Sequence, residues 1–332
     1  MQVPVALVSV ALLLPAAPAN TAIVPGSMTV QWDAGSRDCE RSPPPPLQVH
    51  RYNERSFILR ENPCVTLEAP FMYLLLGSRR ALLIDTGDVR DPAVVPLARA
   101  VLRLLPGEGA ARLPLLVLHT HGHLDHRRGD DQLRALPRVE VIGTDLAHVR
   151  QFFGFGDWPN GIAQIDLGER VLDVLPTPGH YPSEVSYYDR NTALFFSGDF
   201  LLPGRLLIAD KDADLASARR VADFVRDRPV SYVLGGHIEL DAAGNLLDLG
   251  SRYRPNQHVL QLTKQDLLRL PAVVGRFNGF YTRDGMFLMM SQDRVLAALG
   301  AAVLAVLAAL VLLVRWLFLR RRRPAQATTT AR

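Results

Sequence analysis

A short segment in the first half of the chain is dense in side chains that bind metal ions. Residues 119–126 read HTHGHLDH and directly follow an apolar run at residues 115–118. Neutral imidazole and carboxylate are the ligands that suit zinc and related divalent cations. His121, His123, Asp125 and His126 lie within six positions, which is too dense a group to serve packing alone. The segment therefore predicts a metal site in a loop at the end of a strand.

Three more ligand-type side chains follow apolar runs in the same manner. The sequences PTPGH, SGD and GGH place a glycine directly before His180, Asp199 and His237. Glycine permits a tight turn and a close approach of the backbone. The pattern predicts that several strand ends converge on one active site at a sheet edge.

The rest of the chain reads as the α/β scaffold that would position these side chains. Apolar runs predict strands at residues 57–59, 72–76, 81–84, 115–118, 170–175, 184–188, 193–196 and 230–234, with a strand pair around 283–285. Helical periodicity predicts helices at residues 92–105, 130–136, 145–153, 215–226 and 259–268. Strands come first and then alternate with helices, which favours a layered α/β fold.

The complete pattern resembles the metallo-β-lactamase superfamily of hydrolases. It consists of H-x-H-x-D-H followed by His, Asp and His at gaps of 54, 19 and 38 residues, and it spans roughly residues 57–240. The resemblance implies an αββα sandwich with a dinuclear centre of divalent metal ions, zinc being favoured over iron or manganese. By matching position, the first metal would be bound by His121, His123 and His180, the second by Asp125, His126 and His237, and Asp199 would bridge the two.

The resemblance also implies roles beyond metal binding. Asp85, in the sequence LIDTG, matches a strand-end aspartate that supports the ligands from behind, whereas His119 is expected to be structural. Two cations a few ångströms apart lower the pKa of a bridging water, so that hydroxide can attack a carbonyl or phosphoryl group near neutral pH. Asp125 is the candidate for moving the proton, and Asp199 is the second candidate catalytic residue. The candidate substrate contacts are Arg205, Tyr187 and Tyr188.

Individual residues narrow the substrate class. His123 stands where di-iron reductases of this fold carry glutamate, and Asp199 stands where many antibiotic-degrading members carry cysteine or serine. These differences favour hydrolysis of a small ester, lactone or thioester. β-Lactamase or phosphodiesterase activity, an iron-dependent sulfur oxidoreductase and an inactive metal-binding membrane protein stay open as alternatives. The short gaps leave no room for the domain that nucleic-acid-processing members insert, so nucleic acid is not an expected partner.

The two ends of the chain predict an exported protein with a single membrane anchor. Residues 1–22 combine a short apolar run with small residues, as in a signal peptide, with an uncleaved anchor or a buried start as the alternatives. Residues 295–314 contain no charged side chain, and a transmembrane helix is predicted at 295–319. A basic tail follows at 320–332. Because arginine-rich flanks stay in the cytoplasm, the catalytic domain is expected on the other side, in a periplasm or at the cell surface.

Charge and cysteine content agree with this topology. The chain has 37 Lys and Arg against 33 Asp and Glu, but six of the arginines lie in residues 315–332, where there is no acid. The remainder carries a net charge of −2, a poor match for nucleic acid. An exported location favours a disulfide between Cys39 and Cys64, with two independent buried thiols as the alternative. Residues 23–56, which include four consecutive prolines, read as an irregular segment wrapped around a hydrolase domain at 57–290.

Overall fold

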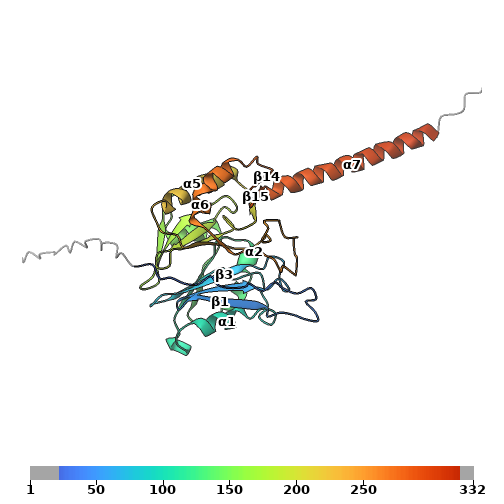
Figure 1. Cartoon of the computed structure of the whole chain (residues 1–332). Coiled ribbons are helices and arrows are strands. Elements are labelled where there is room, and N and C mark those ends of the chain that lie inside the picture. Colours follow the sequence, from blue (N-terminus) through green and yellow to red (C-terminus); the bar gives the residue numbers. More distant parts are fainter. Residues whose placement is uncertain (1–21, 322–332) are drawn as a thin grey trace, which may run out of the picture.

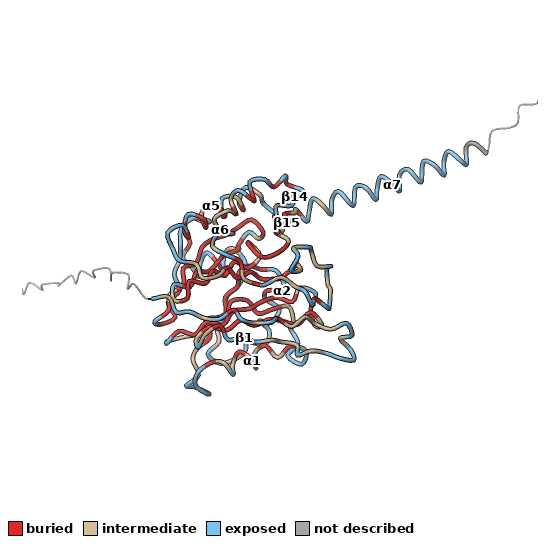
Figure 2. The backbone as a smooth tube through the Cα atoms, in the orientation of Figure 1, coloured by how far each residue is buried: buried red, intermediate tan, exposed pale blue. Residues whose placement is uncertain are grey.

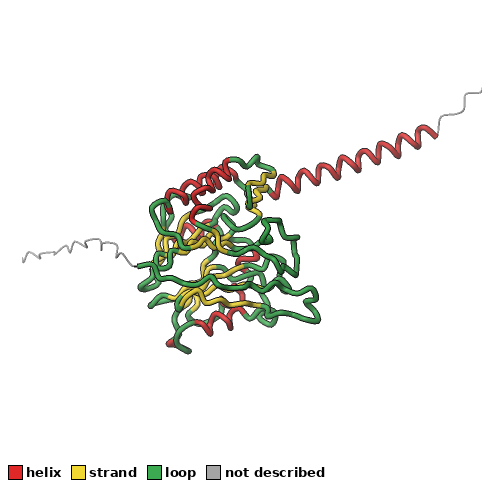
Figure 3. Tube along the Cα trace, viewed as in Figure 1, coloured by secondary structure: helices red, strands yellow, loops and turns green. Residues whose placement is uncertain are grey.

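Residues 22–321 are described by a computed structural model of the chain, so the predicted signal peptide and nearly all of the basic tail lie outside the described residues. Two six-stranded sheets pack face to face, and helices cover both outer faces (Figures 1 and 3). This arrangement confirms the predicted αββα sandwich.

The first sheet has its strands in chain order and carries helix α1 on its outer face (Figure 1). Its strands are β1 (Leu47–Asn53), β2 (Ser56–Glu61), β3 (Phe71–Leu76), β4 (Ala81–Ile84), β5 (Leu115–Leu118) and β6 (Val139–Val141). The helices that follow its strands are α1 (Leu97–Leu104), α2 (Leu124–Arg127), α3 (Asp130–Leu133) and α4 (Leu146–Phe153). Strands β3, β4 and β5 are buried along their whole length, because α1 covers one face and the second sheet covers the other.

The second sheet has the order β13-β12-β10-β9-β8-β7 and is covered by α5 and α6. Its strands are β7 (Ala163–Asp166), β8 (Val171–Pro176), β9 (Val185–Asp189), β10 (Leu194–Gly198), β12 (Tyr232–Gly235) and β13 (Gln261–Leu262). The covering helices are α5 (Lys211–Val225) and α6 (Lys264–Gly275). One apolar core lies between the sheets and includes Tyr73 and Phe196, and another lies under α5 and α6.

A small third sheet joins the sandwich to the C-terminal helix. Its order is β11 (Arg205–Leu207), β15 (Phe287–Met290) and β14 (Tyr281–Asp284), which confirms the predicted strand pair around residues 283–285. Helix α7 (Gln292–Arg321) begins two residues after β15 ends. Within the described residues, one helix is long and apolar enough to cross a membrane, over Gln292–Phe318, and none of its most apolar part is buried.

The N-terminal segment differs from its prediction. Residues 23–56 are not irregular throughout, because β1 forms directly after the proline run and pairs antiparallel with β2. Proline lacks the amide that a strand ladder needs, and the strand therefore starts at Leu47, beyond Pro46. A disulfide joins Cys39 to Cys64, 25 residues apart, and ties this segment to the turn between β2 and β3.

The starts of α5 and α6 are determined by capping side chains. Helix α5 begins four residues before the predicted start, because the Asp210 carboxylate accepts hydrogen bonds from the amides of Asp212 and Ala213. Helix α6 covers Lys264–Gly275 instead of 259–268, because Thr263 and Asp266 form a capping box. Both helices thus have different bounds from those predicted, but they lie in the expected outer layer.

A buried carboxyl on α5 generates a stability prediction. Asp214 is 4% exposed, and its Oδ1 has no hydrogen-bond partner among the described residues. Burial, with the nearby charge of Asp210, raises the pKa of Asp214 to about 8. Between pH 4 and 8 the unfolded chain therefore releases this proton before the folded protein does, so the free energy of unfolding falls as the pH rises.

We expect Asp214→Asn to flatten this pH dependence, because the amide carries no charge to bury. Between pH 5 and pH 8 the melting temperature of Asp214→Asn should fall less than that of the wild type. The two falls should differ by at least about 2–4 °C, which corresponds to about 1 kcal/mol in the free energy of unfolding. Thermal unfolding followed by circular dichroism measures it. Asp212→Asn is the control, because Asp212 lies on the same helix but is exposed. Equal slopes in the wild type and Asp214→Asn would contradict the prediction.

Candidate metal centre

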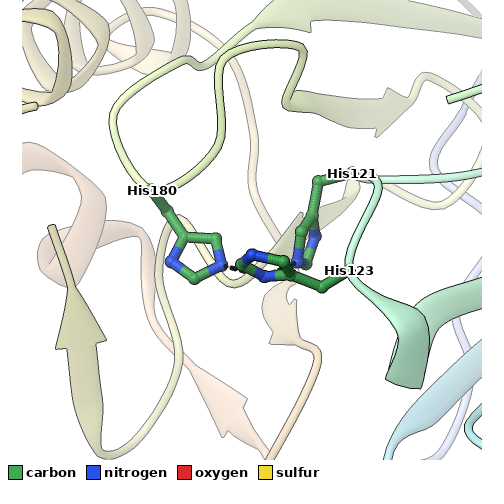
Figure 4. Close-up of side chains that lie close together, drawn as sticks. All are labelled: His121, His123 and His180. Carbon is green, nitrogen blue, oxygen red and sulfur yellow. Dashed lines mark hydrogen bonds between the residues drawn. The ribbon is translucent and has the colours of Figure 1, made fainter. Parts of the chain in front are cut away.

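The structure brings all seven predicted ligands together in two adjacent groups. Within each group the ligand atoms lie within 4.8 Å of one another. The first group is His121, His123 and His180, and the second is Asp125, His126, Asp199 and His237. Figure 4 shows the three imidazoles of the first group converging from two different loops.

Three nitrogen atoms meet in the first group. His123 Nδ1 lies 3.0 Å from His121 Nε2 and 2.9 Å from His180 Nε2. The hydrogen-bond network assigns the tautomer of His180, because its Nδ1 donates to the Leu207 carbonyl at 2.7 Å. In a neutral imidazole the other nitrogen then presents a lone pair, so His180 Nε2 points a lone pair into the group.

Two nitrogen atoms face each other in the second group. His126 Nε2 and His237 Nε2 are 3.2 Å apart. His126 Nδ1 donates to the Asp85 carboxylate at 2.9 Å, and His237 Nδ1 faces the Glu68 carbonyl at 3.3 Å. Both Nε2 atoms therefore carry lone pairs when the rings are neutral. The Asp125 carboxylate lies 3.3 Å from the first Nε2 and 3.1 Å from the second.

Asp199 lies between the two groups. Its Oδ1 is 3.4 Å from His126 Nε2 and 3.5 Å from His237 Nε2, while its Oδ2 is 3.7 Å from His180 Nε2. Oδ1 is buried and has no hydrogen-bond partner in residues 22–321. One carboxylate thus contacts both groups, as a bridging ligand must.

The donor set fits divalent cations. Lone pairs that face one another at about 3 Å repel unless positive charge lies between them. Imidazole nitrogen and carboxylate oxygen are borderline and hard ligands, which suit zinc, iron and manganese. Each group supplies at least three such atoms. The side chains present therefore match a metal centre in number and in chemistry.

Electrostatics differ between the two groups. Burial and neighbouring imidazoles lower the pKa of His121 well below 6.5, and burial lowers the pKa of His123 and His180, so all three are neutral near pH 7. Burial alone would lower the pKa of His237, but Asp199 and Asp125 raise it to about 9. The carboxylates that favour a proton there would equally favour a metal cation, which binds in competition with protons.

Strand direction explains why the ligands converge. Strands β8 and β10 both pair antiparallel with β9, and β12 pairs parallel with β10, so these three strands end at the same edge. Ligands His180, Asp199 and His237 follow those ends. Strand β5 of the other sheet ends opposite them, since the Tyr187 hydroxyl donates to the His119 carbonyl at 2.7 Å.

Gly236 keeps the second group open. A Cβ atom built on it would lie 2.5 Å from Asp199 Oδ1 and 2.7 Å from His126 Cε1. Any larger residue would displace these ligands. The glycine directly before His237 is therefore required by the close approach of three chain segments.

Asp85 supports the ligands from behind. It is 1% exposed and adopts a positive φ of 63°. Its carboxylate accepts hydrogen bonds from the Thr120 amide at 2.8 Å, the Thr120 hydroxyl at 2.9 Å and His126 Nδ1 at 2.9 Å. These bonds orient the His126 ring and the start of the ligand loop. His119 lies outside both groups and contacts Asp130 Oδ1 at 2.8 Å.

The three predicted substrate contacts are placed elsewhere or are already paired. Tyr187 is fully buried in the core between the sheets, and the Tyr188 hydroxyl donates to the Pro229 carbonyl at 2.8 Å. Neither ring is exposed to a substrate, because both faces of β9 are covered. The Arg205 side chain is 14% exposed and forms an ion pair with Glu239 at 3.2 Å.

Tyr181 is the aromatic residue that sequence reasoning missed. It directly follows His180, is partly exposed, and packs its ring edge-on against His123 with centroids 4.9 Å apart. Its hydroxyl lies over Gly122, where a Cβ atom would approach it to 2.7 Å. The sequence feature that could have indicated Tyr181 is its position directly after the ligand His180 in a loop. Tyr187 and Tyr188 belong to a strand.

Comparison with known proteins agrees with this fold. The profile of the Metallo-beta-lactamase superfamily matches residues 65–237, more than half of the chain. The chain therefore belongs to this superfamily and is a metallo-hydrolase. It is 28% identical over 217 residues to the acyl-coenzyme A thioesterase MBLAC2 of Gallus gallus, covering 55% of this chain and 77% of that protein.

Other similar proteins include an enzyme named for a different substrate and a protein of solved structure. The hydroxyacylglutathione hydrolase of Synechococcus sp. (strain JA-2-3B'a(2-13)) is 28% identical over 245 residues, covering 69% of this chain and 88% of that one. A metallo-beta-lactamase from Pontibacter korlensis superposes with a TM-score of 0.48 at 15% identity, covering 70% of this chain and 100% of that chain.

Metal analysis tests the two groups separately. We expect the purified protein to hold two divalent ions per chain, one for each group. His180→Ala and His237→Ala should each lower the metal content by one ion, because each removes a ligand from one group only. Plasma emission spectrometry measures the ratio. His148→Ala is the control, since its side chain is 64% exposed outside both groups. A metal content unchanged by both ligand substitutions would contradict the assignment.

The support from Asp85 is tested by metal affinity. We expect Asp85→Asn to weaken metal binding about 10–100-fold, because an amide cannot accept from both Thr120 and His126 as the carboxylate does. Competition with a chromophoric chelator measures the affinity. Asp91→Asn is the control, because Asp91 lies in the same loop but is exposed. Equal affinities in the two variants would show that Asp85 does not support the site.

Proposed function

We propose that this metallo-hydrolase cleaves thioesters or related small esters and lactones at a centre of two divalent ions. The observation that carries the proposal is the position of the Asp199 carboxylate, which contacts both ligand groups. The choice of thioesters is supported by two similar proteins, one named an acyl-coenzyme A thioesterase and the other a hydroxyacylglutathione hydrolase. In the substrates for which both proteins are named, an acyl group is attached to the sulfur of a thiol.

The proposed ligand roles follow the two groups. His121, His123 and His180 would hold one ion, His126, His237 and Asp125 would hold the other, and Asp199 would contact both. Zinc is the favoured identity for this donor set, with iron and manganese as alternatives. When bound, the two ions would lower the pKa of a water and polarise the carbonyl of the substrate.

Side chains of the protein would orient the reactants and move the proton. The Asp125 side chain is 21% exposed, which is the largest exposure among the four ligands of the second group. A water molecule can therefore reach it. Its Oδ2 would accept the proton that the attacking water loses and return it to the departing thiolate. Tyr181, beside His123, replaces Tyr187 and Tyr188 as the candidate aromatic contact for the substrate.

We further propose that α7 spans a membrane and that the hydrolase domain is extracytoplasmic. The proposed organisation is a signal peptide at 1–22, the hydrolase domain at 57–290 with β1 added to it, a membrane helix at 295–319 and a cytoplasmic tail at 320–332. It is supported by the apolar, exposed surface of α7 and by the arginines that follow it. The Cys39–Cys64 disulfide is of the kind that persists outside the cytoplasm.

A substrate panel tests the proposed reaction. We expect the full-length protein to hydrolyse acyl-coenzyme A and acyl-glutathione thioesters faster than β-lactams or phosphodiesters. Thiol release measures the thioesters, the absorbance of the lactam ring measures the β-lactams, and release of a coloured phenol measures aryl phosphodiesters. Asp199→Ala should abolish hydrolysis, because it removes the ligand that the two groups share. His148→Ala, outside the site, should keep full activity.

Two outcomes would contradict the proposal. Full activity after chelation and verified metal removal would exclude a metal-dependent reaction. Cleavage of phosphodiesters with no cleavage of thioesters, esters or lactones would assign the site to a different substrate class.

A further inference from the structure

Helix α7 begins beside the first ligand group. Strand β15 pairs parallel with β11 in a register that places Met290 next to Leu207. The Leu207 carbonyl accepts the hydrogen bond of His180 Nδ1 at 2.7 Å. Paired strands lie about 5 Å apart, so the start of α7 at Gln292 is on the order of 15 Å from the imidazole of His180.

The start of α7 is attached firmly to the domain. The Ser291 amide donates to the Phe280 carbonyl at 3.1 Å, and the Val295 amide donates to the Ser291 carbonyl at 3.0 Å. Arg294 Nη1 donates to the Gly279 carbonyl at 3.0 Å. The helix therefore leaves in a direction that the β14–β15 hairpin determines.

That direction sets the side of the domain that faces the membrane. Figure 1 shows α7 leaving the domain beside β14 and β15, away from α1 at the opposite end. Figure 2 shows that α7 is exposed beyond its first turn, as far as Phe318, and extends away from the domain. A bilayer crossed by α7 would therefore lie next to the third sheet, whose strand β11 ends at Leu207, the residue that holds His180.

Exposed apolar side chains lie next to the ligand groups on this side. Leu67 is 63% exposed and Leu249 is 76% exposed, and both line a small depression that also includes Ile238, the neighbour of His237. Leu124, between two ligands, is 46% exposed. Leu67 and Leu249 thus lie together beside His237, and Leu124 lies among the ligands, and large exposed apolar side chains around a site indicate a contact surface. We name Leu67, Leu124 and Leu249 the apolar rim.

The rim is connected to the base of α7. Phe280 and Tyr281 are 45% and 50% exposed at the β14 end of the hairpin that holds the helix. Arg283 of the same hairpin donates from Nη2 to the Gly244 carbonyl at 2.7 Å, in the loop that leads to Leu249. Aromatic side chains next to a membrane helix are typical of the bilayer interface.

We propose that the apolar rim rests on the bilayer and that the substrate is an amphiphile whose acyl chain comes from that bilayer. This inference rests on the proposed function, because it requires α7 to cross a membrane and the site to cleave an acyl bond. The partner of the apolar rim is the lipid surface itself. Helix α7 would enter that surface directly from the β14–β15 hairpin, which contacts the loop leading to Leu249. The ester or thioester group of a lipid held at the interface reaches the ligand groups without leaving the membrane.

The opposite end of the sandwich provides a matched control. Val24 is 41% exposed, and its amide donates to the Asn191 carbonyl in the turn between β9 and β10. That turn precedes β10, whereas the ligand groups follow it. Val24 is therefore an exposed apolar residue at the end away from the proposed membrane contact.

Fluorescence quenching tests the orientation without any enzymatic activity. The full-length chain is reconstituted into vesicles of phosphatidylcholine and phosphatidylglycerol that contain a lipid with a spin label near its headgroup. A fluorophore attached to Leu249→Cys should lose fluorescence when this lipid is present, and one attached to Val24→Cys should not. The native cysteines do not react, because they form a disulfide. Equal fluorescence of the 249 label with and without the spin-labelled lipid would overturn the orientation.

A kinetic comparison tests the substrate class. In the same vesicles, Leu249→Asp should lower the ratio of the rate on a bilayer-embedded long-chain thioester to the rate on a soluble short-chain thioester about tenfold or more, because it places a charge where leucine met lipid. Val24→Asp should leave this ratio unchanged. An unchanged ratio in Leu249→Asp would overturn the proposal that the rim delivers membrane substrates.

The two tests separate this inference from the function on which it rests. A wild-type protein that cleaves no thioester, ester or lactone refutes the proposed function, while quenching at position 249 still decides the orientation. A protein that does not float with the vesicles refutes the membrane anchor and the inference together.

Discussion

Mutual repulsion of lone pairs is the constraint on which this structure depends. Around Asp199, nitrogen and oxygen atoms of the ligand side chains lie 2.9–3.7 Å apart, and their lone pairs repel one another unless a proton or a metal cation lies between them. The sandwich holds them there by rigid means, since each ligand follows the end of a buried strand or begins a short helix. Hydrogen bonds from the far nitrogens of His126 and His180 to Asp85 and to the Leu207 carbonyl orient the rings. The fold thus holds electron-rich atoms close together at one edge of the sheets, where a metal cation would relieve their repulsion.

Much of the site could be predicted because its signals are local. Each ligand stands directly after an apolar run and a glycine or a short turn, so spacing along the chain reports position at the sheet edge. Gly236 shows why the glycine is there, since a Cβ atom would occupy the space between Asp199 and His126. The sandwich was predicted from the resemblance of this pattern to a known superfamily, because strands alone do not specify how two sheets face each other.

The features that escaped prediction depend on partners distant in sequence. Tyr187 and Tyr188 were predicted to contact the substrate. Successive side chains of a strand point to opposite faces of the sheet, but both faces of β9 are covered, so neither ring is exposed. Arg205 is paired with Glu239, a residue 34 positions later that only the fold brings near. Strand β1 was hidden because its ladder depends on β2 rather than on its own composition. The capping residues of α5 and α6, Asp210 and Thr263 with Asp266, are visible in the sequence. Apolar periodicity does not include capping, so it placed both helix starts incorrectly.

Ser291 is the single residue between the last strand and α7, and it is only 5% exposed. Both its amide and its carbonyl form backbone hydrogen bonds. Proteases that release cell-surface domains need an extended and accessible stretch of chain, which this junction does not offer. In the proposed topology the catalytic domain would stay with its helix for the lifetime of the protein. The amount of enzyme at the membrane would then be adjusted through synthesis and degradation of the whole chain rather than through shedding.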